Sequence, residues 1–369
     1  MSCQCYDRTD VTDPARYRLY SQQIVESRFK RPKDLVGWMG AMQAQDFAMV
    51  KWGIGVRLPN VSETEIERAI DKGEIIRTHL LRPTWHCVSA DDIYWMLELT
   101  APKIKASMKS RHRELELDHA VIAKSKKIIE KALGRTKCLI REDLIAECEK
   151  GLIPTDNNRA SHLLMLAELD GLVCSGELKG RKQTYALLED RVPKTQSLSR
   201  HEALARLATK YFTSHGPASL RDFVWWSGLS VVDAKLALEA VKPAFLSETV
   251  GSQTYWFADS KCVSVSSREE VHLLPAFDEF IISYTDRSSS LRNMDHAKAI
   301  FNNGIFRPVV IVNGRVEGTW KRTLEKGRVV IRLEPFDRPS KQRLRMIQEA
   351  SERYGTFLEK EIELVPKSC

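Results

Sequence analysis

The chain lacks the features that mark membrane and secreted proteins. Its apolar runs all fall short of the roughly 18 residues that a membrane span needs. The first eight residues, Met1–Arg8, lack the apolar core of a signal peptide. We therefore expect a cytoplasmic protein with no membrane segment.

Paired cysteines are missing as well. None of the eight cysteines forms a Cys-x-x-Cys motif, and Cys3 and Cys5 are too close in the chain for an ordinary disulfide. Reduced thiols are the expected state in the cytoplasm. The spacing indicates no metal site, and we expect no cofactor.

Two common catalytic motifs are absent: the Gly-x-Ser-x-Gly turn of many hydrolases and the glycine loop that binds phosphates. Low-complexity tracts and long linkers are absent too. The 369 residues have room for two to four domains with real hydrophobic cores.

Charge of one sign is only in modest excess. The net charge is +8, and the excess lies in residues 101–196 (19 basic, 14 acidic) and 261–369 (19 basic, 15 acidic). Residues 1–100 (13 basic, 14 acidic) and 197–260 (6 of each) are balanced. This distribution is compatible with phosphate binding, but many proteins that bind no nucleic acid share it.

The pattern of apolar residues predicts a mainly α protein with some β structure. We expect three tandem winged-helix modules followed by a small C-terminal β-barrel, because the order helix, helix, helix, hairpin recurs three times. The predicted boundaries are 10–115, 116–196, 197–260 and 261–369. In the first module we expect helices at 14–28, 32–42, 47–56 and 62–72, and strands at 75–81 and 84–88.

The second module gives the clearest pattern. We expect its helices at 120–133, 140–150 and 158–169, and a hairpin whose tip, residues 178–182, carries Lys179, Arg181 and Lys182. A helix-turn-helix with a basic hairpin tip suits DNA, because a helix enters a groove and the tip reaches phosphates. Polar hairpin tips also serve solubility alone, so this interpretation has an alternative.

The third module repeats the order, and the C-terminal part changes to β-branched runs. We expect helices at 199–214, 219–226 and 230–242, and strands at 246–250 and 253–257. Beyond them we expect strands at 306–312, 316–320, 328–333 and 357–364, and one helix at 340–353. Asn313-Gly314 is a strong hairpin-turn signal.

The string Gln43-Ala44-Gln45 lies between two predicted helices, the second of which Asp46 is suited to cap. Inside a helix, residues two apart point about 200° from each other, whereas in an extended joint they point the same way. Two neutral amides are poor acids and bases, but they orient a water or bridge sugar and phosphate groups. Taken alone, the string is more typical of two solvated or helix-capping amides.

Five strings together resemble the AlkZ/YcaQ-type DNA glycosylases, a superfamily built from winged helices. They are the Gln-apolar-Gln string with Asp46, and the stretches 77–86, 215–228, 273–280 and 306–315 with Gly318-Thr-Trp320. The resemblance runs from about residue 15 to about residue 360. It implies a glycosylase of base excision repair that acts on alkylated purines, such as N7-alkylguanine and N3-alkyladenine, in double-stranded DNA.

The resemblance also implies that Gln43 and Gln45 are the catalytic pair. One branch of the family has Asp at the second position, so Gln45 places the chain with the AlkZ-like branch, some members of which act on interstrand crosslinks. Crosslink activity does not follow from the motif alone. We expect a monomer that needs no metal ion.

The expected chemistry agrees with the two amides. An alkylated purine is already cationic and departs neutral, so the reaction needs no general acid. The enzyme must place a water near C1′ and stabilise positive charge on the sugar, which fixed dipoles do well. No lysine is placed by motif as a Schiff-base nucleophile, so we expect a monofunctional enzyme without strand cleavage.

Other candidate residues have structural alternatives. The run 103–113, which includes Lys103 and Lys105, has five basic and no acidic residues, and it suits either a DNA groove or a solvated connector. Arg322 and Arg328 are weaker candidates for a hairpin that contacts DNA. We expect His79 and His86 to bond to nearby backbone, and the pair Trp225-Trp226 to lie in the core.

Two other functions are open at this point. A non-catalytic transcription regulator with tandem winged helices would have the same modules and basic tips, and Gln43 and Gln45 would then be incidental. A protein whose wings bind other proteins is the third alternative. Release of N7-methylguanine from DNA would separate the glycosylase from both.

Overall fold

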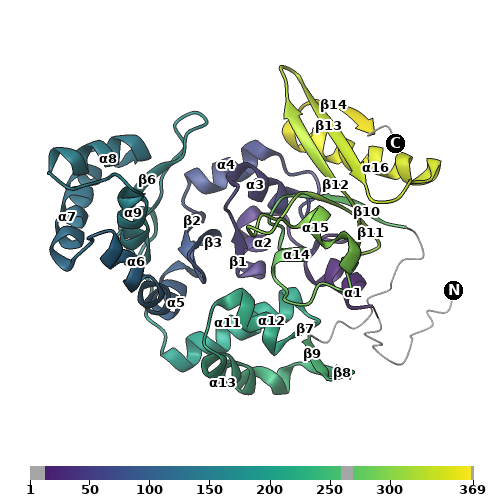
Figure 1. Cartoon of the computed structure of the whole chain (residues 1–369), viewed down its shortest axis with the longest axis horizontal. Helices are drawn as coiled ribbons and strands as arrows, with labels where there is room; N and C mark the ends of the chain where they lie inside the picture. The colour runs from purple at the N-terminus through teal and green to yellow at the C-terminus, as the bar shows by residue number, and fades with distance from the viewer. Residues whose placement is uncertain (1–12, 259–268, 367–369) are drawn as a thin grey trace.

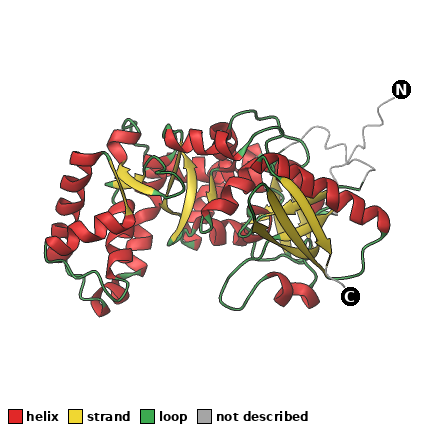
Figure 2. Ribbon diagram, turned by 90° about the horizontal axis from the view of Figure 1, so that it is seen from above, coloured by secondary structure: helices red, strands yellow, loops and turns green. Residues whose placement is uncertain are grey.

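The computed structural model describes residues 13–258 and 269–366, and Cys3, Cys5, Cys262 and Cys369 lie outside these ranges. Helices and short strands are interspersed throughout these ranges (Figures 1 and 2). The other four cysteines, Cys87, Cys138, Cys148 and Cys174, are free thiols. No helix in these two ranges is long and apolar enough to cross a bilayer.

The first segment, residues 13–114, combines helices with a three-stranded sheet in the order β1-β3-β2. Its elements are α1 (Pro14–Ser21), α2 (Pro32–Met39), β1 (Ala41–Gln43), α3 (Phe47–Gly55), α4 (Glu63–Asp71), β2 (Ile75–Leu80), β3 (Thr84–Ser89), α5 (Ile93–Ser107) and α6 (Lys109–Glu114). The predicted helix at 32–42 is too long. Gly40 has a φ of +79°, a conformation that favours glycine, and the chain then enters β1, which pairs with β3.

The basic run 103–113 lies on two helices, α5 and α6, which meet at Met108. Helix α5 contains Pro102, which did not prevent the helix from continuing to Ser107. Ile104 and Met108 are buried against Met165 and Leu169, so packing on the next segment supports this helix.

The second segment, residues 119–191, has its own hydrophobic core. Its elements are α7 (His119–Thr136), β4 (Cys138–Ile140), α8 (Arg141–Lys150), α9 (Arg159–Leu169), β5 (Val173–Ser175), β6 (Thr184–Leu187) and α10 (Leu188–Arg191). The sheet order is β4-β6-β5, and the turn between β5 and β6 carries the predicted basic tip. This segment lies at one end of the molecule, on the left in Figure 1.

The third segment, residues 200–257, repeats this arrangement, with the sheet order β7-β9-β8. Its elements are α11 (Arg200–His215), β7 (Ala218–Ser219), α12 (Leu220–Ser227), α13 (Val231–Val241), the 3-10 turn η1 (Lys242–Ala244), β8 (Leu246–Val250) and β9 (Gln253–Phe257). In all three segments, helices and one short strand precede a hairpin. The sequence predicts these segments to be winged helices, and that finer assignment stays a prediction.

The C-terminal segment, residues 271–366, has a curled five-stranded sheet in the order β10-β11-β12-β13-β14. Its elements are β10 (Val271–Leu274), α14 (Glu279–Ile282), η2 (Asn293–Asp295), α15 (His296–Ala299), β11 (Val309–Val312), β12 (Arg315–Leu324), β13 (Arg328–Pro335), α16 (Lys341–Leu358) and β14 (Glu361–Pro366). The turn at Asn313-Gly314 is confirmed, because both residues have positive φ and join two antiparallel strands.

The expected barrel is only half a barrel. After α16 the chain returns as β14 parallel to β13, which extends the sheet at that edge, while β10 forms the other edge. Residue Phe357, expected in a strand, lies in α16. The sheet lies at the end of the molecule opposite the second segment (Figure 2).

Two shared hydrophobic cores hold the candidate site. One joins the first and third segments, and the other joins the first segment to the C-terminal sheet. Strand β1 lies where they meet, because Ala41 belongs to the first core and Met42 to the second. Alternate side chains of a strand point to opposite faces, so burial on both faces fixes the position of Gln43 at the end of β1.

Candidate functional site

The two glutamines lie on one extended stretch of chain. Gln43 ends β1 opposite His86 of β3, and the N–H of Ala44 donates to the Trp85 carbonyl at 2.7 Å. Ala44 is fully buried, Gln43 is 7% exposed, and Gln45 is exposed. The sequence expectation of a joint between two helices was therefore partly wrong, since the first glutamine belongs to a strand. That both amides share one ligand stays a prediction.

The link to the next helix is as predicted. The Asp46 carboxylate accepts a hydrogen bond from the N–H of Met49 at 3.0 Å and so caps α3. Arg77 donates from Nε to the carbonyl of Ala44 at 3.0 Å. The backbone on both sides of Gln45 is thus tied down while its side chain faces solvent.

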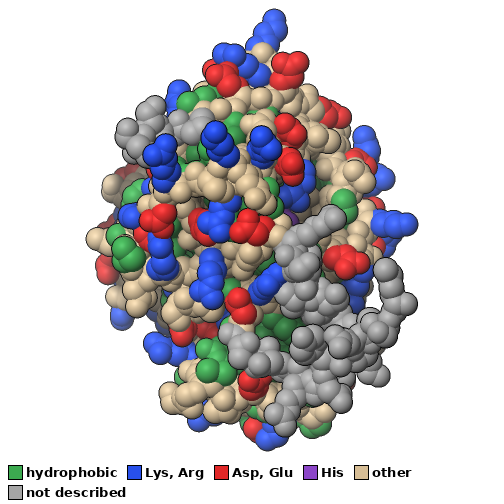
Figure 3. Space-filling view, turned by 90° about the vertical axis from the view of Figure 1, so that its right-hand side faces the viewer, with side chains coloured by type: hydrophobic (Ala, Val, Ile, Leu, Met, Phe, Trp, Pro, Cys, Tyr) green, Lys and Arg blue, Asp and Glu red, His purple; other side chains and the backbone are tan. Residues whose placement is uncertain are grey.

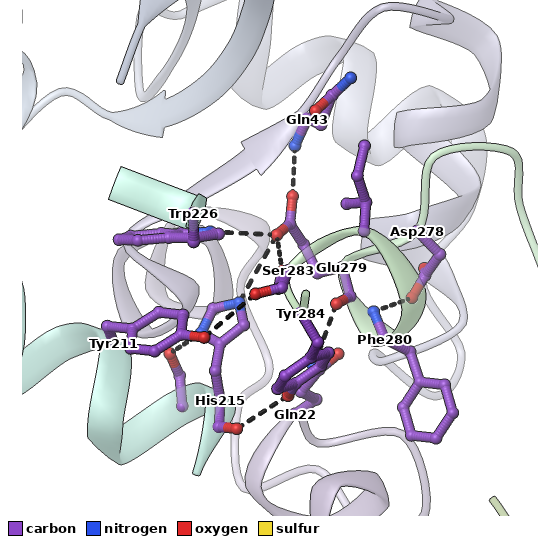
Figure 4. A network of polar contacts seen from close by, with 12 residues as sticks. Gln22, Gln43, Tyr211, His215, Trp226, Asp278, Glu279, Phe280, Ser283 and Tyr284 are labelled. Carbon is purple, nitrogen blue, oxygen red and sulfur yellow. Dashed lines mark hydrogen bonds and ion pairs between the residues drawn. The ribbon is translucent and has the colours of Figure 1, made fainter. Parts of the chain in front are cut away.

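Gln43 is held from two sides by residues far away in the sequence. Its backbone N–H donates to Oε1 of Glu279 at 2.6 Å (Figure 4). Its side-chain Oε1 accepts from Nη2 of Arg82 at 2.8 Å. Because an amide oxygen has two lone pairs and its nitrogen two hydrogens, Gln43 keeps one acceptor and two donor positions for a substrate or a water.

Glu279, at the start of α14, is a buried carboxylate at the centre of a polar network (Figure 4). Its donors are the Gln43 N–H, Nε1 of Trp226 at 3.1 Å and the Ser283 hydroxyl. Nε2 of His215 approaches to 3.5 Å. Burial by itself raises the pKa of Glu279, but the His215 imidazole and the hydrogen bonds from Ser283 and Gln43 outweigh it and hold the pKa at about 2.

The network continues through the third segment to Gln22, which follows α1. The Tyr211 ring stacks on His215 with the ring centres 4.9 Å apart, and its hydroxyl donates to the Ser283 carbonyl at 3.1 Å. The Tyr284 hydroxyl donates to the His215 carbonyl at 2.7 Å and accepts from Gln22 at 3.0 Å. Burial lowers the pKa of His215. Elements from three parts of the chain thus support the backbone of Gln43.

A buried ion pair fixes the neighbouring turn. Both Nη atoms of Arg57 donate to the Asp278 carboxylate at 2.8 Å, and its Nε donates to the Gln22 carbonyl at 3.0 Å. Asp278 also accepts from the N–H of Phe280 and so caps α14. A bidentate pair with further hydrogen bonds holds a helix start in one geometry.

Sequence reasoning missed Glu279 and Arg82 as site residues. Both lie in the stretches 77–86 and 273–280, which carry the family resemblance, but nothing local indicates their contact with Gln43. The bond between Gln43 and Glu279 spans 236 residues. Only the three-dimensional arrangement of β1 and α14 reveals it.

The two candidate histidines are not placed as catalysts. Nδ1 of His86 lies 3.0 Å from the Thr84 carbonyl, as the backbone alternative predicted, and burial together with the Arg82 charge lowers its pKa to about 3. His79 pairs instead with the Glu168 carboxylate of α9, and its ring lies 4.4 Å from the Trp85 ring. His79 therefore links the first and second segments.

The expectation that both tryptophans lie in the core holds for one of them. Trp226 is fully buried, whereas Trp225 is 42% exposed. Consecutive residues of a helix point about 100° apart, so only one of the two faces the core. Nε1 of Trp225 donates to the Ile282 carbonyl at 2.8 Å.

The seven basic candidates lie on four elements: the β5–β6 turn, α5, β12 and β13. Lys179, Arg181 and Lys182 are exposed at the β5–β6 turn, where Lys179 and Lys182 exchange two backbone hydrogen bonds. Lys103 is exposed on α5. In the described ranges, none of these four side chains pairs with a carboxylate, although Nζ of Lys179 donates to the Cys138 carbonyl at 3.3 Å.

The other three basic candidates contact side chains of the protein. Lys105 of α5 pairs with Asp170 at 2.6 Å. Arg322 of β12 donates to the Tyr354 hydroxyl, and Arg328 of β13 pairs with Glu325 and Glu363 at 2.7 and 2.9 Å. On the face seen from the right of Figure 1, basic and acidic side chains are interspersed and form no uniform basic patch (Figure 3).

Among the residues that the structure describes, no metal centre is found. No group of three or more His, Cys, Asp or Glu side chains is arranged there to hold an ion.

Comparison with known proteins gives two matches. A family model described as "DNA glycosylase AlkZ-like" matches residues 36–357. Among solved structures, the DNA glycosylase AlkZ of Streptomyces sahachiroi superposes with a TM-score of 0.76 at 16% sequence identity, over 95% of this chain and 98% of that chain. No curated protein matches by sequence. At this identity the structural match shows a shared fold, and the family model is the evidence for kinship.

Proposed function

The chain belongs to the AlkZ-like DNA glycosylase family, and from this premise we propose that it hydrolyses the N-glycosidic bond of alkylated purines in double-stranded DNA. We propose a monofunctional enzyme that works as a monomer. N7-alkylguanine and N3-alkyladenine are the expected substrates. The same chemistry extends to bulkier N7 adducts and interstrand crosslinks, because they carry the same cationic purine.

The observation that carries this proposal is the way Gln43 is fixed. Its backbone is bonded to a buried carboxylate and its amide oxygen to Arg82, so the amide has one orientation. A preorganised dipole costs no reorganisation when charge develops in the transition state. Gln43 therefore suits a role in placing a water near C1′ or in stabilising the sugar cation.

Glu279 supports the same mechanism from behind Gln43. Its carboxylate is ionised at neutral pH and lies one hydrogen bond from the Gln43 backbone. A negative charge in a buried environment acts over a longer range than one in water. It favours the positive charge that the sugar gains as the glycosidic bond breaks, and it does so without touching the substrate.

Gln45 supplies the exposed member of the pair. Since its side chain faces solvent and Ala44 is buried beneath it, the DNA backbone reaches Gln45 first. We propose that Gln45 binds the target nucleotide or shares the attacking water with Gln43. The three helix-and-hairpin segments would then be winged helices that position the duplex over this stretch.

Excision assays on Gln43→Ala and Gln45→Ala test the site. With DNA that contains N7-methylguanine, each change should slow the release of the base about 10- to 1000-fold, as removal of a preorganised dipole does. Binding to undamaged DNA should barely change. The double variant should lose less than the product of the two single effects if both amides hold one water.

Two results would count against the proposal in different ways. Wild-type rates in the double variant, with its thermal midpoint unchanged, would remove the catalytic role of the pair. If the wild-type protein binds undamaged DNA but releases no alkylated base, the non-catalytic regulator becomes the better assignment.

A further inference from the structure

Trp225 is an exposed aromatic residue that is nevertheless held in one position. It is 42% exposed, and its Nε1 donates to the carbonyl of Ile282 at 2.8 Å. The core beneath it is already filled by Trp226, which is fully buried. A large ring that is anchored at one edge and open to solvent elsewhere is suited to contact with a ligand.

Two arginine side chains flank this ring. The guanidinium carbon of Arg82 lies 5.5 Å from the centre of the Trp225 ring, and that of Arg287 lies 5.8 Å from it. Arg82 also donates to Oε1 of Gln43, so the cluster of Arg82, Trp225 and Arg287 adjoins the proposed catalytic glutamine. Arg287 donates to the carbonyls of Ile281 at 2.9 Å and Thr285 at 3.3 Å.

Neither arginine forms an ion pair with a carboxylate in residues 13–258 and 269–366. Carboxylates act on them only from a distance, Glu279 on Arg82 and Asp222 and Asp286 on Arg287. Burial lowers the pKa of both arginines, and burial together with the Arg82 charge lowers that of Arg287 to about 10. Two neighbouring, partly buried cations that form no ion pair attract an anion.

We propose that Arg82, Trp225 and Arg287 form a nucleotide-binding platform beside Gln43. The two guanidinium groups bind a backbone phosphate of the damaged strand, and the Trp225 ring stacks on an unpaired base of that strand. This inference rests on the proposed function, because it takes the damaged strand to pass over Gln43.

The chemistry of the three side chains fits this ligand. Guanidinium groups match the geometry of a phosphate and bind it through paired hydrogen bonds. Base faces inside a duplex are covered by their neighbours, so a protein ring stacks on a base only where pairing is interrupted. The platform should therefore recognise DNA in which a nucleotide is unpaired and should ignore the intact duplex.

Binding to a duplex with an unpaired base tests the proposal without requiring catalysis. The probe is a duplex with one bulged, unpaired nucleotide, compared with the same duplex without it. Trp225→Ala should weaken binding to the bulged duplex roughly 5- to 50-fold, as removal of one base–aromatic stack does, and should leave the intact duplex within about twofold. Trp225→Phe, which keeps a ring but loses the bond to Ile282, should stay within about threefold of wild type.

A second test of the proposal uses Arg287. Arg287→Gln should reduce the slope of log affinity against log salt by about one on the bulged duplex, whereas Arg287→Lys should retain the slope. The thermal midpoint of each variant identifies any that fails to fold. If Trp225→Ala misfolds, the comparison of Trp225→Phe and Arg287→Gln with wild type still decides.

The outcomes separate this inference from the proposed function. Equal weakening on both duplexes, no weakening, or a Trp225→Phe variant as weak as Trp225→Ala would overturn the platform. A platform effect in a protein that releases no alkylated base would contradict only the proposed function. If the wild-type protein releases alkylated bases but the Trp225 and Arg287 variants bind the probe as wild type does, only the platform is contradicted.

Discussion

At the level of single residues, Glu279 determines how Gln43 is presented. Its carboxylate accepts from the Gln43 N–H, from Trp226 and from Ser283, and an amide in its place has only one oxygen to accept. Glu279→Gln should therefore leave at least one buried donor unpaired and lower the free energy of unfolding by about 1–3 kcal/mol. Urea denaturation measures this change.

Excision assays on Glu279→Gln should also show slower release of N7-methylguanine, because the negative charge behind Gln43 is gone. The control is Glu349→Gln on the exposed face of α16, which should leave both stability and excision unchanged. A Glu279→Gln variant as stable and as active as wild type would show that the network around this carboxylate is dispensable.

At the level of elements, local signals predicted what local forces decide. The Asp46 cap, the Asn313-Gly314 turn and the helices of the second segment follow from neighbouring residues, and the structure has them. Strand β1 could not be predicted, because its pairing partner β3 lies more than 40 residues further along the chain. The contacts of Gln43 with Glu279 and Arg82 are equally non-local, so the sequence indicated the glutamines but not what orients them.

The cap of α3 offers a test of how an element positions the site. Asp46→Ala should cost about 1 kcal/mol of stability, and so should Ser62→Ala at the cap of α4. Only Asp46 adjoins Gln45, so only Asp46→Ala should also slow excision, and Asp46→Asn, an equally good cap, should restore it. Equal rates for the two alanine variants would show that Gln45 does not depend on this cap. Urea denaturation and single-turnover excision are the measurements.

The β5–β6 turn is the element that we expect to bind phosphates. Lys179, Arg181 and Lys182 are exposed there and pair with no carboxylate among the described residues. Changing all three to Ala should weaken binding to undamaged DNA and reduce the salt slope by roughly one unit for each phosphate that the turn no longer binds. The matched control is Arg328→Ala, because Arg328 already pairs with Glu325 and Glu363. An unchanged slope in the triple variant would place the DNA on another surface.

At the level of the whole molecule, the site depends on cores shared between distant parts of the chain. Strand β1 packs into one core with the third segment and into another with the C-terminal sheet, while the second segment has a core of its own and contributes only Cys174 and Leu188 to the first of these. Conditions that loosen the shared cores should therefore disturb Gln43 before they unfold the second segment. Acid is such a condition, because two buried neutral histidines lie in the first segment and in the C-terminal sheet.

Burial lowers the pKa of both His86 and His272 to about 3. In the unfolded chain, each of these imidazoles takes up a proton near pH 6.5. In the folded protein, each does so only near pH 3. Stability should therefore fall as pH drops from about 6.5 towards 3, by up to about 2.7 kcal/mol per pH unit for the pair. Glu279, with its pKa lowered to about 2, adds a further decrease in stability below about pH 4.5.

Urea denaturation between pH 7.5 and 5 measures how the free energy of unfolding depends on pH. His272→Gln should reduce this slope by the contribution of one proton, while excision at pH 7.5 persists. A stability that stays flat between pH 7.5 and 5 would mean that these histidines are protonated in the folded protein.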